Sequence, residues 1–256
     1  MTAEGLAALN RRAHEEVWGV PPGGGARTPV TVDARGPWPV LRMARDDGSW
    51  VALNGARAPV RDASRQLADV DLSAASAIVV VGAGLGYILD ALDGAGQRPP
   101  VVVLEPCGAF VDACLGRRDW RSWIRERRLL ISCGPDFTEL TAAGRAWPDL
   151  FLTPAVIVSP VLARELPAFV RAAQASVERV RAGAHANADA RRRFAAPYLL
   201  NTLANLAVLD READVDALEG AASGMPAVVI GAGPSLDRAI DDLRRVSGRA
   251  VLIATD

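Results

Sequence analysis

The chain has 256 residues, half of them hydrophobic, and a formal net charge of −1 from 29 basic and 30 acidic side chains. This length allows one large core or two smaller ones, and the composition excludes an intrinsically disordered chain. All the basic residues are arginine, as codon bias in a GC-rich genome would produce, and the near balance of charge gives no indication of nucleic acid as a partner.

The cysteines and the apolar segments bear on the cellular compartment. Cys107, Cys114 and Cys133 are an odd set without CxxC spacing, typical of reduced thiols rather than a disulfide framework or a zinc site. Residues 1–12 lack an apolar signal core. The uncharged run 72–89 has the length of a membrane span, but its three glycines favour a strand, a turn and a helix in a soluble core. We expect a cytoplasmic protein with no membrane span and with no zinc site or histidine-based metal site.

The first 70 residues are predicted to form a helix and a small β-rich piece. The helix covers residues 4–17, with Leu6, Leu9, Ala13 and Val17 on one face. Residues 21–25 read as a loop because Pro and Gly cluster there. Short strands and a helix are then predicted over residues 30–32, 40–43, 50–53 and 58–67.

Residues 71–160 carry the βαβ pattern of a Rossmann-like α/β domain. A β-branched run, 77–81, leads into a turn with Gly82, Gly84 and Gly86, then a helix, then a strand that ends at Glu105. An acidic residue about twenty positions past such glycines is suited to a ribose hydroxyl. These four residues are therefore a candidate pocket for a nucleotide or S-adenosylmethionine.

A scaffold or protein-contact role for this domain stays open beside the pocket. The glycine spacing is GxGxG rather than GxGxxG, and Val80 stands where methyltransferases usually have an acidic residue. The domain is predicted to continue with a helix, a strand and two apolar segments, over residues 112–126, 129–131, 150–152 and 155–158. Its tryptophans, Trp120, Trp123 and Trp147, are expected to pack under the sheet.

Residues 161–220 are predicted to be a connector of two or three helices, with breaks at Pro167 and Pro197. A helical stripe of Phe194, Leu200, Leu203 and Leu206 is expected to be buried against a neighbour. Asn201 and Asn205 share one helix face, where they would form either helix contacts or ligand contacts. The arginines at 191–193 read as a solvated helix face.

Residues 221–256 are predicted to begin a second Rossmann-like domain. A strand, 227–230, runs into the turn Gly231, Ala232, Gly233, Pro234, Ser235 and Leu236, and a helix and a strand follow over 236–246 and 250–254. Glycines let a ligand approach the backbone, and helix N-terminal N–H groups attract anions, so the turn is a candidate phosphate site. A tight turn without a ligand is the alternative.

Asp256 lies at the carboxyl end of the last predicted strand, where ligands of open α/β sheets bind. It is therefore a candidate contact for a ribose or a divalent cation. One βαβ unit cannot complete a sheet, so we expect the second domain to be truncated and the chain to be an N-terminal fragment.

The string GAGPSLD resembles the nucleotide-binding motif of the Maf (motility-associated factor) glycosyltransferases, whose central domain is shared with MptE-like 6-hydroxymethylpterin diphosphokinases. A similar motif occurs in sialyltransferases that use CMP-sialic acid, with Asn in place of Ala232. Residues 53–63, 79–86 and 101–106 resemble earlier parts of the Maf family, and Arg193-Phe194, Asn201 and Asn205-Leu206 resemble its helical run.

This resemblance implies an enzyme that moves a nonulosonic acid from its CMP form to Ser or Thr of flagellin. The turn at 231–236 would then bind the nucleotide, and a divalent cation would assist. The resemblance assigns no catalytic residue. The alternatives are an MptE-like pterin diphosphokinase, which would use ATP and Mg²⁺, a methyltransferase that would use the turn at Gly82, and an interaction module without catalysis.

Overall fold

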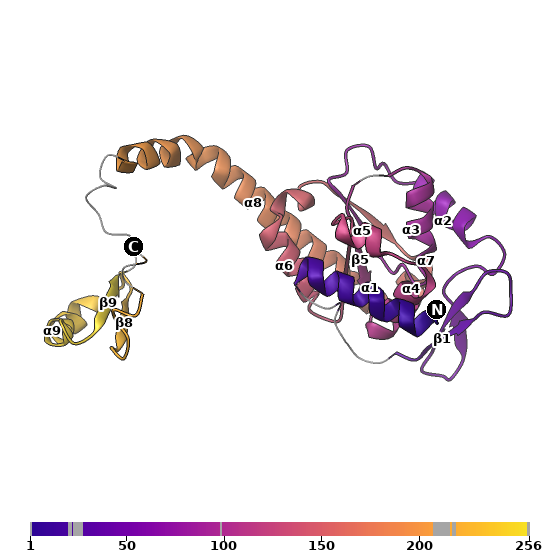
Figure 1. The fold of residues 1–256 in the computed structure, drawn as a ribbon, viewed down its shortest axis with the longest axis horizontal. Helices are drawn as coiled ribbons and strands as arrows, with labels where there is room; N and C mark the ends of the chain where they lie inside the picture. Colours follow the sequence, from indigo (N-terminus) through magenta and orange to yellow (C-terminus); the bar gives the residue numbers. More distant parts are fainter. Residues whose placement is uncertain are drawn as a thin grey trace. The chain divides into compact units, whose positions relative to one another are not determined.

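The computed structural model describes residues 2–19, 22, 28–97, 99–206, 216 and 219–254, and the chain divides into two compact units, Met1–Arg193 and Phe194–Asp256 (Figure 1). The first unit has strands β1 (Val30–Asp33), β2 (Val40–Ala44), β3 (Trp50–Ala52), β4 (Ala77–Val81), β5 (Val101–Glu105), β6 (Leu129–Cys133) and β7 (Pro154–Val158). Its helices are α1 (Ala3–Trp18), α2 (Pro59–Ala68), α3 (Tyr87–Gly94), α4 (Gly108–Arg117), α5 (Arg121–Arg125), α6 (Thr138–Ala146) and α7 (Pro160–Glu165), with a 3-10 turn, η1 (Pro148–Phe151).

Helix α8 (Pro167–Leu206) extends from the first unit into the second, which continues with β8 (Ala227–Ile230), α9 (Leu236–Val246) and β9 (Val251–Ala254). The loop predicted over residues 21–25 lies outside the described residues, apart from Pro22.

A parallel sheet in the order β6-β5-β4-β7 forms the centre of the first unit. Strands β4, β5 and β6 are buried along their whole length, as near-continuous apolar runs predict for a parallel sheet covered on both faces. In register, Val79 of β4 lies opposite Val102 of β5 on one side and Val156 of β7 on the other. The predicted α/β fold is confirmed at this level.

Alternate residues of β4 enter two separate hydrophobic clusters. Ile78 and Val80 pack in a cluster with residues of α1 to α5, whereas Val79 and Val81 pack in one with residues of α6, α7, α8 and the small antiparallel sheet β1-β2-β3. Each fully buried aliphatic side chain of this kind stabilises the fold by roughly 1.5–3 kcal/mol. The helices that follow β4 and β7, α3 and α7, therefore lie against opposite faces of the sheet.

Helix α1 covers the exposed edge of the sheet at β6. His14 Nε2 accepts a hydrogen bond from the N–H of Ile131 at 3.0 Å, and Trp18 Nε1 donates to the carbonyl of Leu129 at 2.9 Å. Two side chains thus satisfy backbone groups that an edge strand leaves unpaired. The predicted helix is confirmed, but its predicted inner face is rotated. Leu9 is 37% exposed, because the fully buried positions include the polar anchors Asn10 and His14.

The helix predicted over 112–126 is instead broken into α4 and α5 at Arg118. Asn10 of α1 satisfies the backbone at the break. Its side-chain amide donates to the carbonyl of Arg118 at 2.9 Å, and its oxygen accepts from the N–H of Trp120 at 3.0 Å. A contact from about 110 residues away thus replaces the helical hydrogen bonds that the local sequence favours.

Two of the three tryptophans that were expected to pack under the sheet are buried. Trp120 and Trp123 are buried in the first unit, and Trp147 meets the ring of Trp18 edge-on at 5.1 Å between centroids. All three cysteines are buried and outside any disulfide, and burial raises the pKa of Cys133 to about 12. None of the helices in the described ranges has the length and apolarity needed to cross a membrane.

In the second unit, β8 and β9 pair in parallel, with Val228 opposite Leu252, and α9 connects them. The predicted bounds of β8 and α9 are confirmed. The predicted break at Pro197 is wrong, since α8 continues through that proline. The predicted burial of the stripe Phe194, Leu200, Leu203 and Leu206 is also wrong, because these side chains are 38–65% exposed.

Candidate functional site

The candidate phosphate site lies in the turn between β8 and α9, and the structure shows the predicted order of strand, turn and helix there. Within it, the N–H of Gly233 donates to the carbonyl of Gly231 at 2.8 Å, and the N–H of Leu236 donates to the carbonyl of Gly233 at 2.9 Å. Among the described residues, no atom lies within 4 Å of the position that a Cβ on Gly231 would take. The backbone there is open to a ligand on that side.

Three N–H groups of this turn remain available. Those of Ala232, Ser235 and Asp237 meet no hydrogen-bond acceptor in the described part of the chain. The Ser235 side chain forms no cap bond with α9 either, so its hydroxyl is free to contact a ligand. N–H groups at the positive end of a helix dipole favour a phosphate, although the Asp237 carboxylate in the first turn opposes it. Asp256 lies outside the described residues.

The glycine turn of the first unit is packed against protein instead. Gly82, Gly84 and Gly86 have φ values of +84°, +56° and +78°, which glycine adopts without strain. A Cβ on Gly82 would lie 2.2 Å from Leu162 Cδ1, and one on Gly86 would lie 3.2 Å from Cys114 Sγ. The glycines therefore permit close contacts with α7 and α4.

The fourth residue of this candidate pocket, Glu105, lies beneath the turn and is fully buried. Its Oε1 accepts a hydrogen bond from the N–H of Gly84 at 2.8 Å, and the N–H of Ala83 also faces the carboxyl group. Burial raises the pKa of Glu105 to about 8, although the N–H groups of Gly84 and Ala83 act to lower it. The sequence suggested the Glu105 side chain as a contact for a ribose. In the structure this side chain instead accepts a hydrogen bond inside the protein. The backbone donors that would bind phosphate are directed to it.

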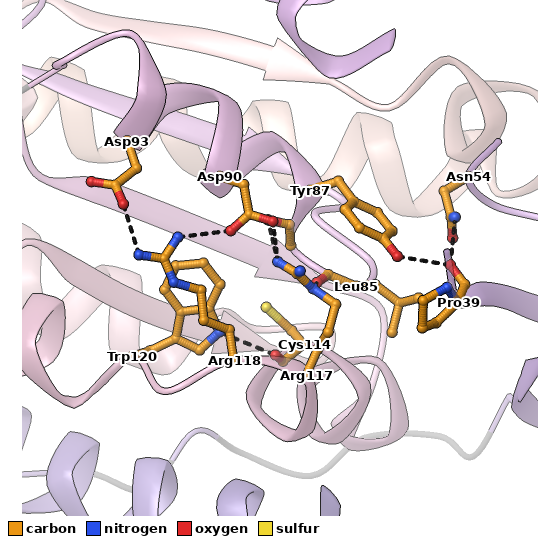
Figure 2. A network of polar contacts seen from close by, with 11 residues as sticks. Pro39, Asn54, Leu85, Tyr87, Asp90, Asp93, Cys114, Arg117, Arg118 and Trp120 are labelled. Atoms are coloured by element: carbon orange, nitrogen blue, oxygen red, sulfur yellow. Dashed lines mark hydrogen bonds and ion pairs between the residues drawn. The ribbon is translucent and has the colours of Figure 1, made fainter. Parts of the chain in front are cut away.

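Arg117 holds the same turn from α4 (Figure 2). Its guanidinium donates to the carbonyls of Leu85 and Gly86 and to the carboxylate of Asp90, and it lies 4.5 Å from the centre of the Tyr87 ring. No local pattern indicates this role, because Arg117 lies about 30 residues from these partners.

The network extends in both directions from Arg117 (Figure 2). Arg118 bonds Asp90 at 2.8 Å and Asp93 at 2.7 Å. On the other side, Tyr87 Oη donates to the carbonyl of Pro39 at 2.9 Å. Side chains from α3 and α4 thus fix the turn and connect it to the loop before β2.

Replacing Asp90 by alanine should destabilise the first unit by about 2–3 kcal/mol, because Arg117 and Arg118 would lose their shared carboxylate. The Asp90 and Arg117 side chains are each only 17% exposed, so water compensates poorly. Urea unfolding followed by tryptophan fluorescence measures this, since all six tryptophans lie between residues 18 and 147.

The matched control is Asp93→Ala. That carboxylate is 35% exposed and meets Arg118 alone, so its loss should cost less than about 1 kcal/mol. Equal losses for the two variants would contradict a central role for Asp90.

Comparisons with known proteins gave one solved structure and no match elsewhere. No protein-family model matches the chain, and no curated protein matches it. The solved structure of a MAf glycosyltransferase from Magnetospirillum magneticum AMB-1 is similar over 98% of this chain and 46% of its own, at 16% identity and a TM-score of 0.43. The chain thus spans about half the length of that protein. The name of that solved structure is that of the family that the sequence motifs resemble.

Proposed function

We propose that the chain is part of a glycosyltransferase of the Maf type, which transfers a nonulosonic acid from a CMP-sugar to Ser or Thr of flagellin. One observation supports the nucleotide part of this proposal. The GAGPSLD turn, which carries the resemblance, is an open strand-turn-helix with N–H groups and a serine hydroxyl that have no partner in the described chain.

In the proposed reaction, the acceptor hydroxyl displaces CMP at the anomeric carbon, and negative charge develops on the leaving phosphate. Hydrogen-bond donors already oriented toward that charge lower the barrier. The N–H groups of Ser235 and Asp237 and the Ser235 hydroxyl would supply them. Gly233 would contribute by its missing side chain, because its own N–H is bonded to Gly231. Among the described residues no group of His, Cys, Asp or Glu is suited to a metal ion, so the proposal assigns no ligand to the divalent cation.

The binding test is calorimetric titration of the protein with CMP, ATP and S-adenosylmethionine, with and without Mg²⁺. We expect CMP to bind, and Ser235→Trp to weaken that binding at least tenfold by filling the open turn. Ser247→Trp, at the other end of α9, is the matched control and should bind CMP normally.

Each alternative has its own outcome in this titration. ATP binding that depends on Mg²⁺ and is lost in Ser235→Trp would favour a pterin diphosphokinase. Binding of S-adenosylmethionine that Ser235→Trp leaves intact would favour a methyltransferase and move the site to the first unit. No binding of CMP, or CMP binding that survives Ser235→Trp, would contradict the proposal.

A further inference from the structure

The parallel sheet of the first unit has a topological switch point between β4 and β7. The chain leaves β4 into α3 on one face of the sheet and leaves β7 into α7 on the other. Connections that part in this way open a crevice at the carboxyl ends of the two strands, where ligands of open α/β sheets bind. A cleft lies there. Gly82 follows β4 and Ser159 follows β7, and both line it.

The cleft has a volume of about 480 Å³, within the range of small-molecule sites. Helix α2 forms its outer wall and is tied to the sheet by Gln66, whose Nε2 donates to the carbonyl of Val158 at 2.8 Å. Pro59, Ile88 and Val161, which belong to α2, α3 and α7, contribute apolar surface to its lining. Such a space accepts a ring that packs on the apolar residues and presents polar groups to α2.

The polar groups of the cleft are mainly acceptors that have no protein donor among the described residues, and Asp62 is exposed to solvent. The Asp62 carboxylate and Gln66 Oε1 have no donor among the described residues. The Ser159 hydroxyl accepts from the N–H of Leu162 at 3.4 Å and retains its own proton to donate. By contrast, Asn54 is fully used, with its amide bonded to Leu41, Pro39 and Gly55.

The charge of the lining residues restricts which class of ligand the cleft can bind. No arginine is among the described residues that line the cleft, and Asp62 is its one charged side chain. The N–H groups of the adjoining glycine turn face Glu105 and offer nothing to an anion. A phosphate would therefore meet a carboxylate without a compensating cation, whereas a pair of neutral hydroxyls would meet the acceptors that they need.

We propose that this cleft binds an unphosphorylated nucleoside, with its ribose hydroxyls on Asp62 and Gln66 and its base between Ile88 and Val161. The absence of a side chain at Gly55 leaves room for the Asp62 carboxylate. A Cβ at that position would lie 2.8 Å from Asp62 Oδ2, so glycine leaves the carboxylate its place in the cleft.

The test is calorimetric titration with adenosine and cytidine, carried out on the Ser235→Trp protein so that binding at the second unit does not contribute. We expect at least one nucleoside to bind with a Kd below about 1 mM, and AMP and CMP to bind at least tenfold more weakly. Asp62→Ala should weaken nucleoside binding by roughly tenfold or more, and Gly55→Ala should weaken it by displacing the carboxylate.

Asp69→Ala is the matched control, since Asp69 is an exposed carboxylate at the end of the same helix and does not line the cleft. It should bind as the parent does. The proposal is overturned if neither nucleoside binds the folded protein, if Asp62→Ala retains full affinity, or if the monophosphates bind more tightly than the nucleosides. Because the second unit is blocked throughout, these results are independent of the proposed transferase function.

Discussion

Replacing Gly82 by alanine should destabilise the first unit by roughly 2–5 kcal/mol. Two costs add here. An L-residue at a φ of +84° is strained by about 1–2 kcal/mol, and the new methyl group would lie 2.2 Å from Leu162 Cδ1, where overpacking costs about 1–3 kcal/mol. Leu162 is 2% exposed and packs in the hydrophobic cluster on that face of the sheet. The Tm of the first unit, measured by tryptophan fluorescence during thermal unfolding, should fall by about 5–15 °C.

Gly94, at the end of the helix that follows this turn, provides the control. Gly94 ends α3 with no atom within 4 Å of its Cβ position and without a positive φ, so Gly94→Ala should be neutral or slightly stabilising. The double variant Gly82→Ala with Leu162→Ala separates the two costs, since it relieves the clash and leaves the backbone strain. If Gly82→Ala behaves as Gly94→Ala does, the close contact with α7 is not a constraint on this turn.

The local elements were predictable because their signals are local. The β-branched run of β4 and the apolar run of β8 each end at a glycine turn, and the structure places both strands where the pattern does. Helix α9 begins and ends at the predicted residues. The hydrophobic periodicity and the positions of Gly and Pro determine such elements, and neither depends on distant contacts.

What could not be predicted depends on side chains that meet across about 100 residues. The break between α4 and α5 is stabilised by Asn10, and the edge of β6 by His14 and Trp18. An asparagine and a histidine on an otherwise amphipathic helix read as surface residues from sequence alone. Their partners are backbone groups, which carry no sequence signal.

For the candidate sites too, the local backbone geometry could be predicted from the sequence, whereas the roles of the side chains could not. The turn at 231–236 could be predicted as an open strand-turn-helix because its geometry follows from Gly and Pro positions. The spacing between Gly82 and Glu105 also predicted their proximity correctly, since Glu105 bonds Gly84. Spacing does not reveal whether a carboxylate faces a ligand or the interior. Asp62, the acceptor proposed for the cleft, lies in residues 53–63, a segment that resembles the Maf family but that the sequence did not connect with a ligand.

Glu105→Gln should change how the stability of the first unit depends on pH. Burial raises the pKa of Glu105 to about 8 in the folded protein, whereas an unfolded glutamate titrates near 4.5. Between these values the folded state holds one proton more than the unfolded state. Stability from this group is therefore complete below pH 4.5 and falls by up to about 1.4 kcal/mol per pH unit until pH 8.

Glutamine keeps an oxygen to accept from Gly84 and carries no charge, so its contribution does not change with pH. The stability of Glu105→Gln relative to the parent should therefore rise steadily from pH 5 to pH 8, as measured by urea unfolding at several pH values. Glu16→Gln, at an exposed position of α1, should show no such trend. A constant difference between Glu105→Gln and the parent across this range would mean that Glu105 stays ionised beneath the turn. In that case the N–H groups of Ala83 and Gly84, which lower its pKa, would outweigh its burial.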